Sequence, residues 1–134
     1  MTLHPKHIKN VSGLKPFDRY NYFIRKVADG EELWTIVDAN DDLGISVIED
    51  DNNTYKTLVP FWPEKDFIED FLTDNWVKHT PVKISLDDFE DKIIAIIEEE
   101  NYLINVFPVN NKTGFVVTLQ ELIRDLNEEL EQYE

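Results

Sequence analysis

The chain has 134 residues, an apolar fraction of 42%, an aromatic fraction of 12% and a formal net charge of −15 at pH 7. This length and composition predict one globular domain with its own core and exclude a disordered chain. The sequence contains no cysteine, which excludes disulfides, thiolate nucleophiles and cysteine-based zinc sites and fits a reducing compartment. There is no apolar run of roughly 18 residues and no apolar signal segment at the N-terminus, so we expect a cytoplasmic protein with no membrane role.

The negative charge is unevenly distributed along the chain. Residues 1–30 hold six Lys or Arg against two Asp or Glu, whereas residues 31–134 hold seven against twenty-six. An acidic body repels phosphate backbones and anionic lipid, which argues against nucleic-acid and membrane partners. The acidic surface is then either simply a solvated one or a surface that steers a basic protein partner.

The N-terminal half predicts an arm, a helix and a meander of strands. Residues 1–15 have no hydrophobic periodicity and are expected to form a loose arm ahead of a single domain over residues 16–134. From Pro16, apolar residues recur every three or four positions and predict a helix that ends at Gly30. Apolar, β-branched runs at residues 33–37, 45–48 and 55–59 alternate with Asp/Asn/Gly clusters, which is typical of antiparallel strands.

A rigid aromatic corner follows the third strand. Pro60 and Pro63 fix their own backbone and restrict the residue before each of them, so Phe61 and Trp62 are held in a stiff turn. Pro63 also suits the first turn of a helix, and the apolar stripe of residues 64–72 predicts an amphipathic helix there.

The C-terminal half predicts two more helices among three strands. Residues 82–84 are expected to form an edge strand that could pair with a second copy of the chain. A helix is predicted from Ser85 to Asn101, with its core face at Leu86, Phe89, Ile93, Ile96 and Ile97. Strands at residues 102–107 and 115–118 precede a last helix, which begins with the capping box of Thr118 and Glu121.

These elements predict an α+β fold. We expect two layers, with a mainly antiparallel sheet of about five or six strands and four helices in the order α-β-β-β-α-β-α-β-β-α.

Several of these segments together resemble the DUF2750 family, a bacterial family of small proteins of unknown function. The shared segments are RYNYFIRKVADGEELW, LVPFWP, SLDDFEDKI and VFP…GFVV…ELIRDL, and the most specific is L-x-P-x-W-P at residues 58–63. The chain departs from the family at residues 45–47, where an aromatic residue is usual. The resemblance implies a bacterial cytoplasmic protein and implies no catalytic residues.

The acidic loop between the first two strands has the spacing of a calcium loop. Counting from Asp38, the residues Asn40, Asp42, Ser46 and Glu49 occupy ligand positions of an EF-hand. The glycine that such a loop needs at its sixth position is replaced by Leu43, and the flanking segments are predicted strands rather than helices. The alternative is an acidic turn between two strands.

No catalytic residue and no cofactor is predicted. The acids at Asp87, Asp88 and Asp91 are explained by a helix start, although a carboxylate site assembled from scattered residues stays open. The histidines are His4 and His7 in the arm and an isolated His79, and no third metal ligand accompanies them.

The leading hypothesis is therefore a non-enzymatic interaction domain, of an immunity or regulatory kind, that meets a basic partner. Core packing explains most of the aromatic residues, but Trp62 between its prolines is a candidate surface anchor, with Phe61 and Trp76 beside it. The alternative is a small-ligand or metal-binding domain that uses the loop from Asp38 to Glu49. The oligomeric state, monomer or homodimer, is open.

Overall fold

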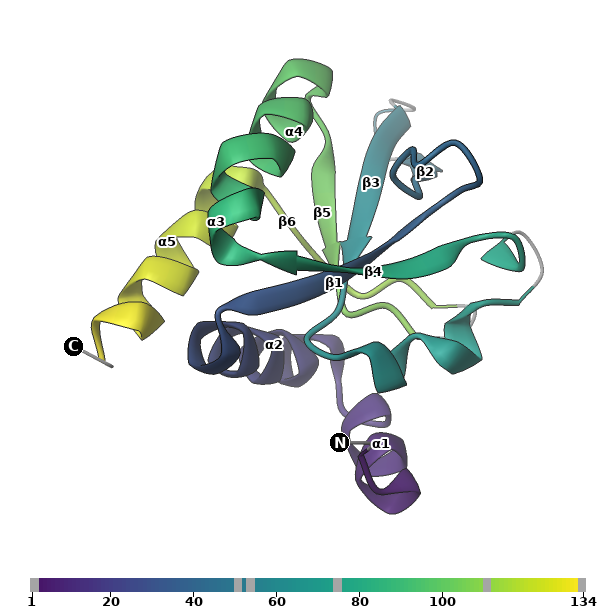
Figure 1. The fold of residues 1–134 in the computed structure, drawn as a ribbon, viewed down its shortest axis with the longest axis vertical. Coiled ribbons are helices and arrows are strands. Elements are labelled where there is room, and N and C mark those ends of the chain that lie inside the picture. Colours follow the sequence, from purple (N-terminus) through teal and green to yellow (C-terminus); the bar gives the residue numbers. More distant parts are fainter. Residues whose placement is uncertain (1–2, 50–51, 53–54, 74–75, 110–111, 133–134) are drawn as a thin grey trace.

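The computed structural model describes residues 3–49, 52, 55–73, 76–109 and 112–132, and it has the predicted α+β architecture (Figure 1). The α-helices are α1 (Pro5–Ser12), α2 (Pro16–Gly30), α3 (Leu86–Asp88), α4 (Ile94–Glu100) and α5 (Leu119–Glu131). The strands are β1 (Glu32–Val37), β2 (Ser46–Glu49), β3 (Tyr55–Phe61), β4 (Thr80–Ser85), β5 (Leu103–Val106) and β6 (Phe115–Val117). None of the helices in these residues is long and apolar enough to cross a membrane.

The strands form two sheets rather than one. β1 pairs with β4, and the other sheet has the order β2-β3-β5-β6. All pairs are antiparallel except β3 with β5, which run parallel because residues 62–102 cross back between them. The two sheets meet at a bridge in which Trp34 and Trp62 exchange backbone hydrogen bonds of 2.9 and 2.8 Å. The predicted three-stranded meander is therefore wrong for β1, which does not pair with β2. An isolated bridge from Val37 to Leu43 joins β1 to the loop before β2 instead.

The N-terminal segment is not the loose arm that we expected. Its residues Pro5–Ser12 form α1, because Pro5 suits the first helical turn and His4 Nδ1 accepts a hydrogen bond from the Lys6 backbone N–H. The helix is held against the body of the protein: Val11 is buried, and the His7 ring lies 3.0 Å from the Tyr22 hydroxyl.

The segment after the aromatic corner forms two turns of 3₁₀-helix, Lys65–Phe67 and Glu69–Phe71, where an α-helix was predicted. The predicted apolar stripe is nevertheless buried, at Phe67, Ile68 and Phe71. The backbone of this segment makes i→i+3 hydrogen bonds. Ile68, at which one turn ends and the next begins, is fully buried.

The helix predicted from Ser85 is divided by a π-turn over Phe89–Ile93 into α3 and α4. It ends as predicted at Asn101, whose φ of 56° is left-handed. The capping box of Thr118 and Glu121 also forms as predicted at the start of α5.

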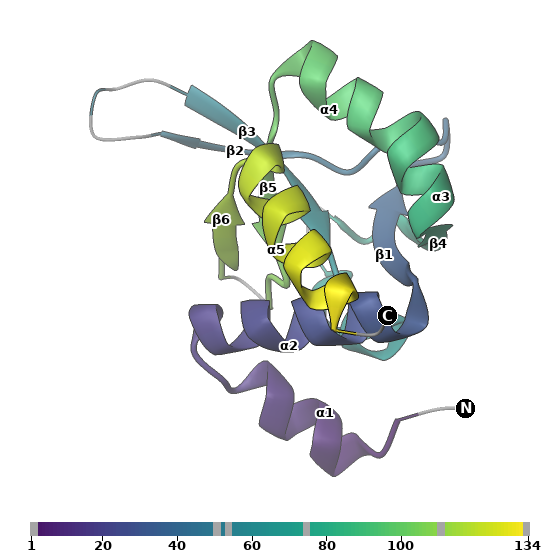
Figure 2. The same cartoon turned by 90° about the vertical axis from the view of Figure 1, so that its left-hand side faces the viewer.

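One hydrophobic cluster extends from Val11 to Leu126 and joins the helices to both sheets. Helix α5 lies alongside the β2-β3-β5-β6 sheet and contacts α2 (Figure 2). At this contact the Tyr20 hydroxyl donates to Asp125 Oδ2 at 2.5 Å. Burial and this carboxylate raise the pKa of Tyr20 above its ordinary value of 10.0. The bond therefore joins the first large helix to the last one.

Candidate functional site

A wide groove, with a volume of about 540 Å³, lies over the β1–β4 pair. Its floor comes from alternate residues of the two strands, namely Thr35, Val37, Val82 and Ile84. The register places Thr35 opposite Val82, and the two-residue period of a strand puts all four side chains on one face. The Thr35 hydroxyl donates to the Pro60 carbonyl at 2.8 Å, so its polar group is already satisfied and the floor is effectively apolar.

One wall of the groove is helical. Ile93, Ile96 and Glu100 face it at spacings of three and four residues, and Tyr102 continues the wall just before β5. The sequence pattern placed Ile96 and Ile97 together on the core face of an uninterrupted helix. The π-turn inserts one additional residue into that helix, so Ile97 is buried while Ile96 is 41% exposed. The expected core position of Ile96 is therefore wrong.

The opposite wall is the acidic loop, through Asp41, Asp42, Leu43 and Ile45. The loop is a tight turn, because Asp38 Oδ1 accepts hydrogen bonds from the backbone N–H groups of Asn40 at 2.8 Å and Asp42 at 3.1 Å.

A glycine next to this turn allows the loop to approach β1. Gly44 donates its N–H to the Ile36 carbonyl at 2.8 Å, and a Cβ atom at Gly44 would lie 2.7 Å from the Ile36 side chain. Gly44, one position after the place where a calcium loop needs its glycine, is thus needed for contact between the loop and the strand.

Three of the predicted calcium ligands, Asp38, Asn40 and Asp42, lie in this turn. Asp38 is engaged in the turn, Asn40 is exposed, and the side chain of Glu49 lies outside the described part of the structure. The flanking segments are strands, as the alternative reading required. The described residues include no group of three or more histidine or acidic side chains that could hold a metal. Calcium binding by Asp38, Asn40, Asp42 and Glu49 stays a prediction.

The structure also shows where the candidate aromatic anchor lies. Phe61 and Trp62 are both fully buried, which excludes the hypothesis that Trp62 is an exposed anchor. β3 extends through Phe61, and the bridge to Trp34 holds Trp62 in the sheet, where its indole N–H donates to the Pro108 carbonyl at 2.9 Å. Trp76 is half-buried and stacks 5.3 Å from Phe71.

Exposed apolar side chains continue the groove onto the β2–β3 hairpin. Among the described residues, four of the seven exposed large hydrophobic side chains form what we call the apolar strip: Ile45, Val47, Tyr55 and Ile96, which are 44%, 57%, 69% and 41% exposed. Val47 pairs with Thr57, and the next residue, Leu58, pairs with Leu103, which follows Tyr102 of the groove wall, so the row leads back toward the groove. Sequence alternation identified these strands but could not show which of their faces is left uncovered.

The charged residues that line the groove are all acidic. Asp41, Asp42 and Glu100 stand on its rim, and none of its lining residues is a lysine, arginine or histidine. We therefore call it the acid-rimmed groove. An apolar surface under carboxylates can hold a ligand that is itself apolar on one side and cationic on the other.

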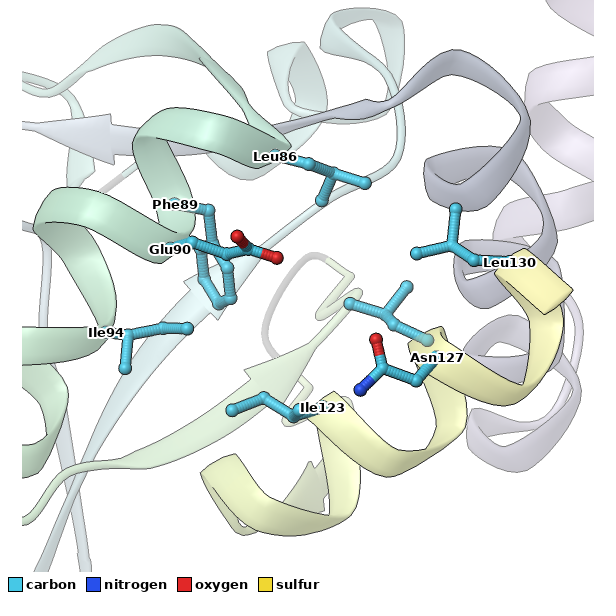
Figure 3. A pocket seen from close by; sticks show the side chains of 8 residues that line it. Leu86, Phe89, Glu90, Ile94, Ile123, Asn127 and Leu130 are labelled. Carbon is cyan, nitrogen blue, oxygen red and sulfur yellow. The ribbon is translucent and has the colours of Figure 1, made fainter.

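A smaller cleft lies between α3, α4 and α5 (Figure 3). Its volume of about 70 Å³ is well below the roughly 300 Å³ of a typical ligand pocket. The side chains of Leu86, Ile94, Ile123 and Leu130 surround it, and the polar ends of Glu90 and Asn127 project into the space between the helices (Figure 3). Its size is that of a gap between packed helices.

Comparison with known families gives one match. The model of the family described as "Protein of unknown function (DUF2750)" matches residues 20–126. No curated protein and no solved structure matches the chain.

Proposed function

Because the chain belongs to the DUF2750 family, whose description assigns no activity, we propose a function from the fold itself: an interaction domain whose acid-rimmed groove binds a basic, amphipathic segment of a partner protein. The setting that we propose is a bacterial cytoplasm, as the family resemblance implies. The observation that carries the proposal is the gathering of exposed apolar side chains beside three carboxylates with no cation among them.

Apolar burial supplies the affinity in this proposal. Ile45, Val47 and Ile96 are aliphatic side chains that remain about half exposed, and covering apolar surface contributes roughly 25 cal/mol per Å². Contiguous apolar surface on a folded protein commonly marks an interaction site.

Charge supplies the selectivity. Asp41, Asp42 and Glu100 attract lysine or arginine side chains of the partner and repel an acidic segment. Since such rim charges are solvated, they affect the rate of association and its salt dependence more than the final affinity.

The test uses a synthetic peptide of about ten residues in which leucine and lysine alternate, long enough to follow the groove at roughly 3.3 Å per residue. Isoleucine-methyl NMR of the full chain reports its position. We expect the Ile45, Ile93 and Ile96 signals to move, while those of Ile24 and Ile104, buried in the core, stay in place. A peptide with glutamate in place of lysine is the control.

Variants of the groove sharpen this test. Ile96→Ala should weaken binding about tenfold because it removes contact area, and Asp42→Asn roughly threefold because it removes one solvated charge. Val77→Ala is the matched control, since Val77 is 66% exposed but lies outside the groove. Equal binding of the lysine and glutamate peptides, or methyl shifts confined to other isoleucines, would refute the proposal.

A second candidate is a small cationic ligand, favoured by the volume of the groove, which lies within the roughly 300–1,000 Å³ of small-molecule sites. A linear aliphatic polyamine serves as the probe in the same NMR experiment. If it moves the groove methyls more strongly than the peptide does, the small-ligand function replaces the protein-interaction function.

A further inference from the structure

The chain carries a surface of the opposite character at its N-terminal end. Exposed Leu14 and Phe17 lie at the junction of α1 and α2, together with the exposed side chains of Lys9 and Lys15. Residues 6–17 contain no acid, although the protein as a whole has a net charge of −15, and the exposed Asp18 follows them directly. We call Lys9, Leu14, Lys15 and Phe17 the basic junction.

The basic junction is held rigidly to the core. Arg19 is only 4% exposed and donates hydrogen bonds to the carbonyls of Leu14 and Phe107. The Phe17 ring packs against the ring of Phe115, and the two ring centroids lie 5.4 Å apart. A surface that is already ordered loses little conformational entropy when it binds. More of the free energy of apolar contact is then available for binding.

We propose that the basic junction of one copy docks into the acid-rimmed groove of a second copy, an inference that rests on the proposed function and names the partner as the chain itself. Leu14 and Phe17 supply the apolar contact for Ile45 and Ile96. Lys9 and Lys15 face the carboxylates of the rim.

The position of the two surfaces decides the kind of assembly. Helix α1 and helix α4 lie at opposite ends of the molecule in both views (Figures 1 and 2). The basic junction of one copy therefore binds the groove of a second copy. The basic junction of the second copy then stays free to bind a third copy. Such head-to-tail contacts repeat and form rings or open chains rather than closed pairs.

Overall repulsion between the acidic copies limits this contact at low ionic strength. At physiological ionic strength, charges farther apart than about 8 Å are largely screened, whereas lysines in contact with the rim are not. We expect association to be strongest at intermediate salt and to weaken at both extremes.

The experiment is sedimentation velocity of the full chain, with one variant for each surface. Phe17→Ala removes the junction contact, and Ile96→Lys places a cation in the groove. The wild type should grow beyond a dimer as its concentration rises, and each variant alone should stay monomeric. An equimolar mixture of the two should form dimers and stop there, because one intact junction meets one intact groove.

The controls separate docking from misfolding. Val77→Ala and Val77→Lys make the matched changes at another exposed apolar residue and should associate like the wild type. Unchanged circular dichroism confirms that the variants fold, and Leu14→Ala replaces Phe17→Ala if that variant does not.

Each result decides the question. A wild type that stays monomeric up to about 1 mM, a closed dimer that does not grow, or a mixture that behaves like its separate components overturns the self-docking. If the wild type is monomeric while the leucine–lysine peptide still moves the groove methyls, the self-docking fails and the proposed function stands. If neither the peptide nor a second copy binds, both fail.

Discussion

Trp62 donates its indole N–H to the Pro108 carbonyl inside the core, and its ring meets Phe71 at 4.9 Å. Trp62→Phe would remove this donor, leave a buried carbonyl without its partner and open a space beside Phe71. We expect the free energy of unfolding to fall by about 2–3 kcal/mol. Urea denaturation followed by circular dichroism measures the loss.

Trp76→Phe is the comparison for that experiment, because Trp76 is half-buried and should lose much less stability. A Trp62→Phe variant as stable as the wild type would show that the indole is not the structural anchor inferred from its contacts.

At the scale of single residues, the sequence indicates which side chains are apolar but not which of them meet water. The two prolines around Trp62 predicted a turn at Phe61 and Trp62, but the backbone is extended there, as the end of β3 and the bridge to Trp34. They could not reveal that Trp34, far away in the sequence, pairs with that corner and buries it. The exposure of Ile45 and Val47 was equally hidden, because an uncovered strand has the same alternation as a covered one.

Helix α5 depends on a reciprocal cap. The Glu121 backbone N–H donates to Thr118 Oγ1 at 3.1 Å, and the Thr118 N–H donates to Glu121 Oε1 at 3.1 Å. Thr118→Ala should lower the free energy of unfolding by about 1 kcal/mol, because the first turn of the helix loses an acceptor. The urea midpoint reports the change.

Thr118→Ser keeps the hydroxyl and should retain most of the stability. If the serine and alanine variants lose the same amount, the methyl group of Thr118 rather than the cap is responsible.

At the scale of elements, local sequence signals predicted the ends of helices and strands well. They could not predict which strands pair when the strands are far apart in the sequence. Gly30, Asn101 and Thr118 mark boundaries where the sequence placed them. The π-turn over Phe89–Ile93 has no marker in the sequence, and it moved Ile96 from the expected core face to the groove. Nothing near β1 indicates that its partner is β4 rather than the next strand along the chain.

The whole molecule should be more stable in salt. Two ion pairs between described residues, Lys83 with Glu32 at 3.7 Å and Lys92 with Asp88 at 3.8 Å, are exposed and contribute little. Screening therefore weakens the repulsion of a net charge of −15 more than it weakens attraction. Raising NaCl from about 10 mM to about 200 mM should increase the free energy of unfolding by about 1 kcal/mol.

Urea is the denaturant for this measurement, because guanidinium chloride would itself screen charge. A Glu98→Gln/Glu99→Gln variant, which neutralises two exposed acids at the end of α4, should respond less to salt than the wild type does. A wild type that loses stability as salt rises would show that attractive pairs outweigh the repulsion.

The sequence was sufficient to predict the fold class, because an α+β arrangement with mainly antiparallel strands follows from local periodicity. The division into two sheets was not, because it depends on contacts between residues far apart along the chain. The groove exists only where those sheets and α4 meet.

The two sheets are also interleaved along the chain. The β1–β4 pair encloses β2 and β3 in sequence, and the sheet containing β3 and β5 encloses β4. Neither the N-terminal half nor the C-terminal half of the chain can therefore complete either sheet without the other half. During synthesis β4 and β5 must find partners, β1 and β3, that were made much earlier, which favours slow, all-or-none folding over stepwise assembly from stable fragments.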